Sequence, residues 1–206
     1  MIHPHTELRF INKEIGFGVF ATKLIPKGTI TWALDELDQK LDPEFVNSTS
    51  TFCQEVLKKY AYRNQDGLYI LCWDLGRYVN HSFHANCMGT AYDFEVAIRD
   101  IYPGEELTDD YGTLNIEEPF ACFPEKGSKR EIVYPDDLLY YHEEWDRQVV
   151  EASHYFDQVE QPLLSLVPPD FIKSFKQAAE NGKLQDSIKN IYYDRNSNRH
   201  FEVECQ

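Results

Sequence analysis

The sequence is short of positive charge. Lys and Arg together number 20 and Asp and Glu number 35, which gives the 206 residues a formal net charge of −15. A nucleic-acid-binding surface needs clustered Lys and Arg to neutralise phosphates, and an anionic membrane surface attracts the same side chains. The composition therefore argues against nucleic acid and membranes as partners. It favours a basic ligand, such as a Lys-rich or Arg-rich peptide.

Long apolar runs, cysteine pairs and a secretory signal are missing as well. No segment approaches the roughly 18 consecutive apolar residues that a membrane-spanning helix requires. The five cysteines are an odd number without a CxxC pair, which argues against a disulfide framework. The first residues, MIHPHTE, have neither the basic nor the apolar region of a secretory signal. We therefore expect a reducing compartment and a cytoplasmic location.

The sequence patterns divide the chain into three units. At roughly 150 residues per domain, its length predicts one compact domain with an extension. Short β-like runs and turn residues dominate residues 5–114, and helical patterns dominate residues 131–206. Residues 115–130 connect them without a Gly/Ser linker, so we expect the extension to pack on the domain. The predicted fold class is α+β, predominantly β.

Apolar spacing predicts the main elements. Residues 92–98, YDFEVAI, alternate apolar with polar or small side chains, which predicts a strand with one buried face. Residues 43–60 are predicted to form one helix with its apolar residues on one side. Residues 138–163 carry apolar side chains three and four positions apart, as one face of an amphipathic helix does. That face either packs on the domain or forms the seam of a homodimer, and a shorter helix is predicted over residues 168–180.

The first of three segments that could carry chemistry is GFGVFA at residues 16–21. It formally satisfies the GxGxxA fingerprint of dinucleotide-binding proteins. That fingerprint must open a helix, whereas Pro26 and Gly28 follow closely here and the intervening residues look like a strand. A hairpin or bulge, or a backbone that approaches a ligand closely, explains the glycine pair better.

The second segment is RYVNHSFHANC at residues 77–87. Its His81, His84 and Cys87 fall at intervals of three, which raises the possibility of a metal site. A zinc site needs about four ligands, and neither a fourth ligand nor a helix that would bring these three together is evident. A hydrogen-bonded polar loop is the ordinary interpretation, and we expect no metal.

The third segment is GEELTDDYG at residues 104–112. Its Asp109 and Asp110 are adjacent on a chain that is predicted to be extended, so their side chains should point to opposite faces. Two carboxylates placed in this way cannot work as the acid/base pair of a glycosidase. Taken alone, the segment is an acidic turn beside a strand.

Together and in this order, the three segments resemble those of the SET-domain family of S-adenosylmethionine-dependent protein lysine methyltransferases. Residues 16–21 are similar to that family's GxG segment, residues 77–82 to its RFINHS segment and residues 104–112 to its GEELTFDYG segment. The resemblance covers roughly residues 7–114. It implies a SET-type fold of small twisted sheets in which the segment with the tyrosine passes under a preceding loop as a pseudoknot, a rare topology.

The resemblance also implies roles for individual residues. Tyr111 would be the catalytic tyrosine, whose hydroxyl can form a hydrogen bond at the point of methyl transfer. The residues implied to bind the cofactor S-adenosyl-L-methionine are Ile15, Gly16, Phe17, Tyr60, Asn80, His81 and Phe120. The residues implied to line the substrate channel are Tyr62, Tyr69, Tyr78 and Asp109, although core packing explains Tyr69 and Tyr78 equally well. Aromatic walls would disfavour the lysine ammonium by desolvation and so help the amine to arrive neutral.

Two departures from the family pattern limit what the resemblance implies. Asp109 stands where the family commonly has Phe or Tyr, at a position that influences how many methyl groups are added, so no methylation state is predicted. Phe83 replaces a zinc-binding cysteine of many members, and Cys122 resembles a lone remnant of the post-SET cysteines. We therefore expect residues 115–130 to be a degenerate post-SET-like segment without zinc.

A hypothesis for the C-terminal region follows from these departures. The helical extension would replace the post-SET element by closing the lysine channel, with Phe120 or Phe123 stacking on the adenine. The function implied for the whole chain is methyl transfer to lysine side chains in a basic protein. Two alternatives stay open: a non-catalytic SET-like module that binds cofactor or peptide, and a methyltransferase acting on a small-molecule amine. Either a monomer or a homodimer is compatible with the sequence.

Overall fold

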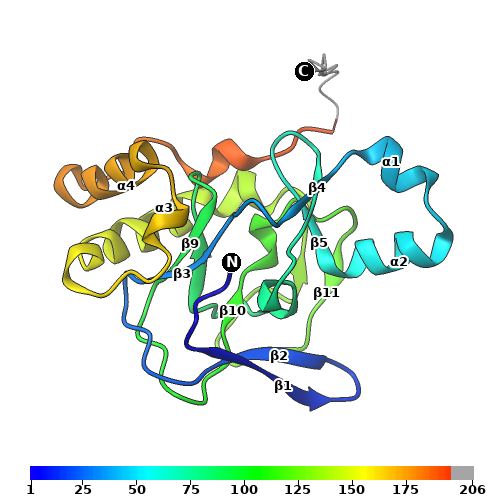
Figure 1. The fold of residues 1–206 in the computed structure, drawn as a ribbon, viewed down its shortest axis with the longest axis horizontal. Helices are drawn as coiled ribbons and strands as arrows, with labels where there is room; N and C mark the ends of the chain where they lie inside the picture. The colour runs from blue at the N-terminus through cyan, green and yellow to red at the C-terminus, as the bar shows by residue number, and fades with distance from the viewer. Residues whose placement is uncertain (196–206) are drawn as a thin grey trace.

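The computed structural model describes residues 1–195, and Figure 1 shows its helices and strands. The strands are β1 (Thr6–Asn12), β2 (Gly16–Ala21), β3 (Ile30–Ala33), β4 (Gln39–Leu41), β5 (Ala61–Arg63), β6 (Tyr69–Leu71), β7 (Asn80–His81), β8 (Cys87–Gly89), β9 (Phe94–Ala97), β10 (Thr108–Asp109), β11 (Phe120–Ala121) and β12 (Ile132–Val133). The α-helices are α1 (Pro43–Ser48), α2 (Thr51–Tyr60), α3 (Asp137–Ser153) and α4 (Pro169–Asn181). The 3-10 turns are η1 (Leu75–Tyr78), η2 (Tyr111–Thr113), η3 (Phe156–Gln158), η4 (Leu164–Leu166) and η5 (Ile188–Ile191).

Within the described residues, the strands pair into small sheets with the orders β1-β2, β3-β9-β8, β4-β6-β5, β10-β7 and β11-β12. The pair β10-β7 is parallel, with Thr108 beside Asn80 and Asp109 beside His81. This pair joins two segments that are far apart in the sequence, as the expected pseudoknot requires. The predicted α+β class of small sheets with a helical C-terminal extension is confirmed. Helices hold more residues than strands because the strands are short.

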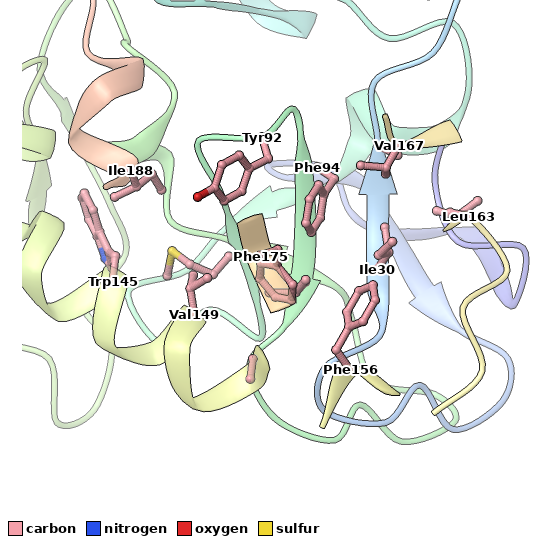
Figure 2. Close-up of a cluster of buried hydrophobic side chains, with 14 of the residues drawn as sticks. Ile30, Tyr92, Phe94, Trp145, Val149, Phe156, Leu163, Val167, Phe175 and Ile188 are labelled. Atoms are coloured by element: carbon pink, nitrogen blue, oxygen red, sulfur yellow. The ribbon is translucent and has the colours of Figure 1, made fainter. Parts of the chain in front are cut away.

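The main hydrophobic core lies between the β3-β9-β8 sheet and the helices α3 and α4 (Figure 2). The ring centroid of Phe94 in β9 lies 5.1 Å from that of Phe175 in α4, and Phe175 lies 5.2 Å from Phe156. The same cluster contains Leu138, Trp145, Val149 and Ala152 of α3, so the apolar face of α3 is buried inside the chain. A second buried cluster, which includes Val19 and Trp32, joins β2 to β3 beside the cavity described below. In Figure 1, α3 and α4 lie on one side of the β3-β9 pair, and α1 and α2 lie at the other end of the molecule.

The single helix expected over residues 43–60 is wrong, because α1 and α2 replace it. Ser50 is the N-cap of α2, and its side-chain oxygen accepts a hydrogen bond from the N–H of Cys53 at 3.3 Å. An N-cap residue has extended backbone, so the first helix cannot continue through it. Phe45 and Phe52 were expected on one apolar side, yet their exposed fractions are 55% and 74%.

The helix expected over residues 138–163 is shorter than predicted. Helix α3 ends at Ser153 and the chain continues through η3. The apolar residues beyond the helix still reach the core, since Phe156 and Leu163 are only 2% and 3% exposed. The next helix, α4, agrees with its prediction, and Gly182 closes it with the left-handed φ of 67°.

Gln161 attaches the segment after α3 to strand β3. Its Oε1 accepts a hydrogen bond from the N–H of Ile30 in β3 at 2.9 Å. Its Nε2 donates to the carbonyl of Gly28 at 2.8 Å. One side-chain amide therefore serves the outer edge of β3 as the peptide of a neighbouring strand would.

Two further findings concern the chain as a whole. None of the helices between residues 1 and 195 is long and apolar enough to cross a membrane. Cys53, Cys72, Cys87 and Cys122 are free thiols. Cys205, like the end of the extension predicted over residues 131–206, lies outside the described residues.

Candidate active site

A cavity of about 370 Å³ lies where β3, β5, β9 and β10 meet the end of α2. The exposed side chains of Lys58 and Glu118 stand at its mouth, and the buried Asp109 lies at its inner end. Trp32 and Glu95 also line the cavity, although the sequence did not single them out. The predicted site residues that line it are Tyr60, Tyr62, Tyr69, Asp109, Tyr111 and Phe120.

Tyr111 is held in the cavity wall from both ends. It begins η2, where the side chain of Asp110 accepts a hydrogen bond from the N–H of Gly112 at 3.0 Å. The Tyr111 hydroxyl donates to the carbonyl of Val79 at 2.7 Å. Burial raises the Tyr111 pKa above its ordinary value, and the nearby charge of Asp109 adds a smaller effect in the same direction. The residue therefore presents a protonated, oriented hydroxyl to the cavity.

His81 lies behind Tyr111 in a shell of aromatic rings. Its Nδ1 accepts a hydrogen bond from the N–H of Tyr111 at 3.1 Å, which leaves Nε2 as the protonated nitrogen of a neutral ring. Burial lowers the His81 pKa and so favours that neutral form. The centroid of its ring lies 4.4 Å from Phe83 and 5.6 Å from Phe120. The buried Nε2 has no partner among residues 1–195, so it can donate to a bound molecule.

Asn80 connects β7 to the first glycine-rich segment. Its Nδ2 donates to the carbonyl of Phe17 at 3.0 Å and to Oε1 of Glu106 at 2.7 Å. Gly18 leaves space for these contacts, because a Cβ there would lie 2.3 Å from Glu106 Oε1, 2.8 Å from Ile11 Cδ1 and 3.0 Å from Asn80 Nδ2. Glu106 was missed by the sequence analysis, although it lies within the third segment. The interpretation of the glycine pair as part of a hairpin is confirmed, since both glycines lie in β2 of the antiparallel β1-β2 pair.

The remaining predicted cofactor residues lie at the end of the β1-β2 hairpin. Ile15 and Phe17 are 38% and 46% exposed, and Gly16 between them has a φ of +89° that favours glycine. The Phe17 ring centroid lies 6.3 Å from that of Tyr78, which lies 5.4 Å from Tyr60. This row of aromatic rings joins the hairpin to the cavity, so the structure brings the three sequence segments together.

The two other tyrosines of the predicted channel differ in their surroundings. Tyr62 packs edge-on against Trp32 with centroids 6.1 Å apart, and burial raises its pKa well above the ordinary value. The hydroxyl of Tyr69 donates to Glu117 Oε1 at 2.5 Å, and the guanidinium of Arg63 lies 4.7 Å from its ring. Tyr62 is thus a wall of the inner cavity, whereas Tyr69 belongs to an ionic cluster at the outer edge.

The inner end of the cavity is acidic. Asp109 is 2% exposed, and Glu95 of β9 lies half-buried opposite Trp32 in the β3-β9 ladder. Burial raises the pKa of Glu95 to about 7. Burial first, and then the charge of Glu95, raise the pKa of Asp109 well above its usual range. Glu95 carried no sequence signal, since it occupies a polar position of the alternating strand YDFEVAI.

Residues 115–130 contact the second segment through a carboxylate. Glu125 accepts hydrogen bonds from the Ser82 hydroxyl at 3.0 Å and from the N–H groups of Phe83 and His84 at 3.2 and 3.3 Å. The structure places Phe120 beside Tyr111 and His81, with centroids 6.1 and 5.6 Å apart. Glu125 thereby fastens the loop that carries Phe120 against the site.

No group of three or more His, Cys, Asp or Glu side chains between residues 1 and 195 is arranged to hold a metal ion. The spaced trio of the second segment does not converge. Cys87 is fully buried in β8, His84 is exposed and has its Nε2 3.1 Å from the carbonyl of Lys126, and His81 Nδ1 is taken by Tyr111.

Comparison with known proteins adds one positive finding. Residues 16–112 match the family model described as SET domain. The matched span begins at the first glycine of GFGVFA and ends one residue after Tyr111, so it includes all three segments. A search of curated proteins found no match.

Proposed function

We propose that this chain, whose residues 16–112 form a SET domain of the methyltransferase family, transfers methyl groups from S-adenosyl-L-methionine to lysine side chains of a basic protein. The observation that carries the proposal is the placement of Tyr111. Its protonated hydroxyl is fixed in the wall of an aromatic cavity, next to a histidine with a free buried nitrogen. Positioning of the amine and control of its charge are the main tasks in such a displacement.

The residues beside the cavity fit the cofactor. S-adenosyl-L-methionine supplies an electrophilic methyl group on a sulfonium sulfur. His81 offers its unpaired Nε2, and Asn80 holds the backbone carbonyl of Phe17 next to Gly18. Ile15, Gly16 and Tyr60 would complete this side, with the ring of Phe120 as the stacking surface.

The cavity fits a lysine side chain in shape and chemistry. Tyr62, Trp32 and Tyr111 provide aromatic surface that can pack on the lysine methylenes and face its nitrogen. The Tyr111 hydroxyl lies where it can orient that nitrogen. The net charge of −15 favours approach of a Lys-rich segment over a phosphate backbone.

One observation favours a second candidate function. The acidic inner end formed by Glu95 and Asp109 could retain a cation without turnover, which is what a non-catalytic SET-like binding module would do. Methylation of a small-molecule amine is the third candidate. Both are decided by the same experiment.

The experiment measures transfer of labelled methyl groups to a panel of basic proteins and to free lysine. Wild type is compared with Tyr111→Phe and with Tyr140→Phe, a matched control on a side chain that is 72% exposed. Calorimetry follows cofactor binding in parallel. We expect protein labelling to fall by about 100-fold in Tyr111→Phe only. Cofactor binding without transfer to any acceptor contradicts the enzyme and supports the module, and labelling of free lysine alone supports the third candidate.

A further inference from the structure

The inner end of the cavity combines two carboxyl groups with an indole N–H. Glu95 and Trp32 are register partners in the β3-β9 ladder, so their side chains lie side by side on one face of the sheet. Asp109 reaches the same space from β10, and all three residues line the cavity. None of these three residues is needed to bind a methyl donor or to orient the Tyr111 hydroxyl.

Two buried polar atoms here have no hydrogen-bond partner among residues 1–195. They are the acceptor Oδ1 of Asp109 and the donor Nε1 of Trp32, whose residues are 2% and 7% exposed. Leaving such atoms unpaired is costly, and native proteins usually pair them with a ligand or water. An acceptor and a donor at one end of a cavity suit a guest that brings N–H groups, with the indole N–H free to stabilise a carboxylate.

The charges of the site narrow the guest to a cation. Four basic side chains line the cavity, and each has a partner within the described residues. Lys58 and Arg63 pair with Glu118 and Glu117 at the mouth, Lys59 lies 5.1 Å from the centroid of the Tyr60 ring, and the guanidinium of Arg77 lies 5.3 Å from that of Tyr78. The N-terminal ammonium also acts on Glu95 and favours its ionised form. Burial raises the pKa of both inner carboxyls, and the charge of Glu95 further disfavours ionisation of Asp109, so the singly ionised pair is the form that can receive a cation. A monoanionic pair beside aromatic rings is a receptor for one ammonium group.

We propose that Glu95 and Asp109 together receive the substrate ammonium and take its proton, which makes the amine a nucleophile. The proposal rests on the proposed function. One N–H bond of the ammonium breaks and its electron pair remains on nitrogen, while an O–H bond forms on a carboxylate oxygen of the pair. The ammonium and the monoanionic pair both become neutral, so no isolated charge is left in the cavity. The proton later returns to water through the cavity mouth.

This role explains the carboxylate at position 109. A neutral Asp109 would not oppose deprotonation of the amine, because the negative charge of the pair then lies on Glu95. Asp109 alone would bind the ammonium and keep it charged, whereas Asp109 together with Glu95 accepts a proton from it.

Single-turnover transfer of labelled methyl groups between pH 6 and 9 tests the proposal. We expect the wild-type rate to rise through about pH 7 and then level. Glu95→Gln and Asp109→Asn should each lower the rate at pH 8 by about 10-fold to 100-fold, and Glu95→Asp should recover part of it. In the double variant Glu95→Gln with Asp109→Asn, the plateau should be replaced by a rate that keeps rising with pH, because the amine must then lose its proton unaided.

Glu143→Gln is the matched control, since it removes the same charge from an exposed position on α3. It should keep the wild-type profile. A double variant with the wild-type profile and a rate within threefold of wild type overturns the proposal while leaving the proposed function intact. Wild type that labels no acceptor overturns the proposed function and this inference with it.

A second readout does not depend on activity. Urea unfolding between pH 5 and 8 compares wild type with the double variant. Since the pKa of each inner carboxyl is raised in the folded protein, their ionisation destabilises wild type as pH rises, and the amides cannot follow. We expect the difference in unfolding midpoint to change across this range. Parallel curves for the two proteins overturn the proposal whatever the activity, because the pair then does not titrate near neutral pH.

Discussion

The side chains of Asp109, the last residue of β10, and Asp110, the residue after it, lie on opposite sides of the chain. Asp109 lines the cavity, whereas Asp110 forms an ion pair with Arg130 on the side that faces α3. The alternation predicted from an extended chain is confirmed. One dipeptide therefore contributes both to the candidate site and to the attachment of the C-terminal helices.

Arg130 is expected to be the strongest polar contribution to that attachment. Its guanidinium forms ion pairs with the buried Asp110 and Asp137 and lies 4.3 Å from the ring of Tyr141. Arg130→Met would leave two buried carboxylates unpaired, so we expect a loss of about 3–5 kcal/mol in the free energy of unfolding. Urea denaturation measures it.

Arg147→Met is the control for that variant. Arg147 pairs with Glu144 on the surface, and its side chain is 62% exposed. The free energy of unfolding should not differ measurably from that of wild type, as surface ion pairs generally contribute little. Equal losses from both variants would show that burial of the Arg130 pairs is unimportant.

Gly18→Ala should weaken cofactor binding. The new methyl group would collide with Glu106 Oε1 and displace Asn80, which holds the Phe17 carbonyl. We expect the cofactor dissociation constant to rise at least about 10-fold, equivalent to about 1.4 kcal/mol. Calorimetry provides the measurement. Gly89→Ala is the control, because its Cβ would meet only Ile188 at an ordinary 3.6 Å within the described residues.

Stability should decline in acid because of His3. Burial, with a smaller contribution from the neighbouring His5, lowers the His3 pKa to about 4. The unfolded chain binds the proton more tightly, so the stability that neutral His3 provides above pH 6.5 is lost as the pH falls toward 4. The loss should be roughly 3 kcal/mol at most. His3→Gln should flatten this part of the unfolding curve against pH, whereas His154→Gln, at an exposed position, should leave its slope unchanged.

Phe175→Ala tests whether the extension belongs to the main core. The ring is fully buried between Phe94 and Phe156, so its removal should cost about 3–5 kcal/mol. Phe52→Ala, at a ring that is 74% exposed, should change stability by less than about 0.5 kcal/mol. Thermal and urea unfolding distinguish the two.

Truncation after Asn115 gives a related expectation. It removes α3 and α4 and exposes the apolar face of the β3-β9-β8 sheet, so the shortened chain should aggregate or unfold. Point substitutions are therefore the sharper test of what the extension does for cofactor binding. A truncated chain that stays folded would contradict the shared core.

The three segments could be located from sequence because each depends on local residue order. The glycine pair, the NHS loop and the acidic segment before Tyr111 keep their chemistry wherever the chain turns. Their convergence could be inferred only from the family resemblance, since a parallel pair such as β10-β7 depends on contacts between distant residues. The early end of α3 was hidden for the same reason. Its apolar spacing continues into η3 and Leu163, where tertiary packing rather than helix formation buries the side chains.

The acidic inner end was harder to foresee. Asp109 was recognised as unusual, but its partner Glu95 looked like the exposed position of an alternating strand. Only the opposite pairing of Trp32 shows that this face of β9 lines a cavity. Glu125 likewise lies in a loop without a recognisable motif, and only its contacts with Ser82 and Phe83 show that it supports the site.

The amide of Gln161 has a consequence for how copies of this chain meet in solution. A bare edge of a sheet is a template on which another chain can add a strand and begin an aggregate. By occupying the N–H of Ile30 and the carbonyl of Gly28, Gln161 removes the two groups with which an incoming strand would begin. Further along β3, the backbone of His3 donates to the carbonyl of Thr31 and that of Met1 accepts from the N–H of Ala33, so the glutamine and the first residues of the chain together block intermolecular growth at this edge.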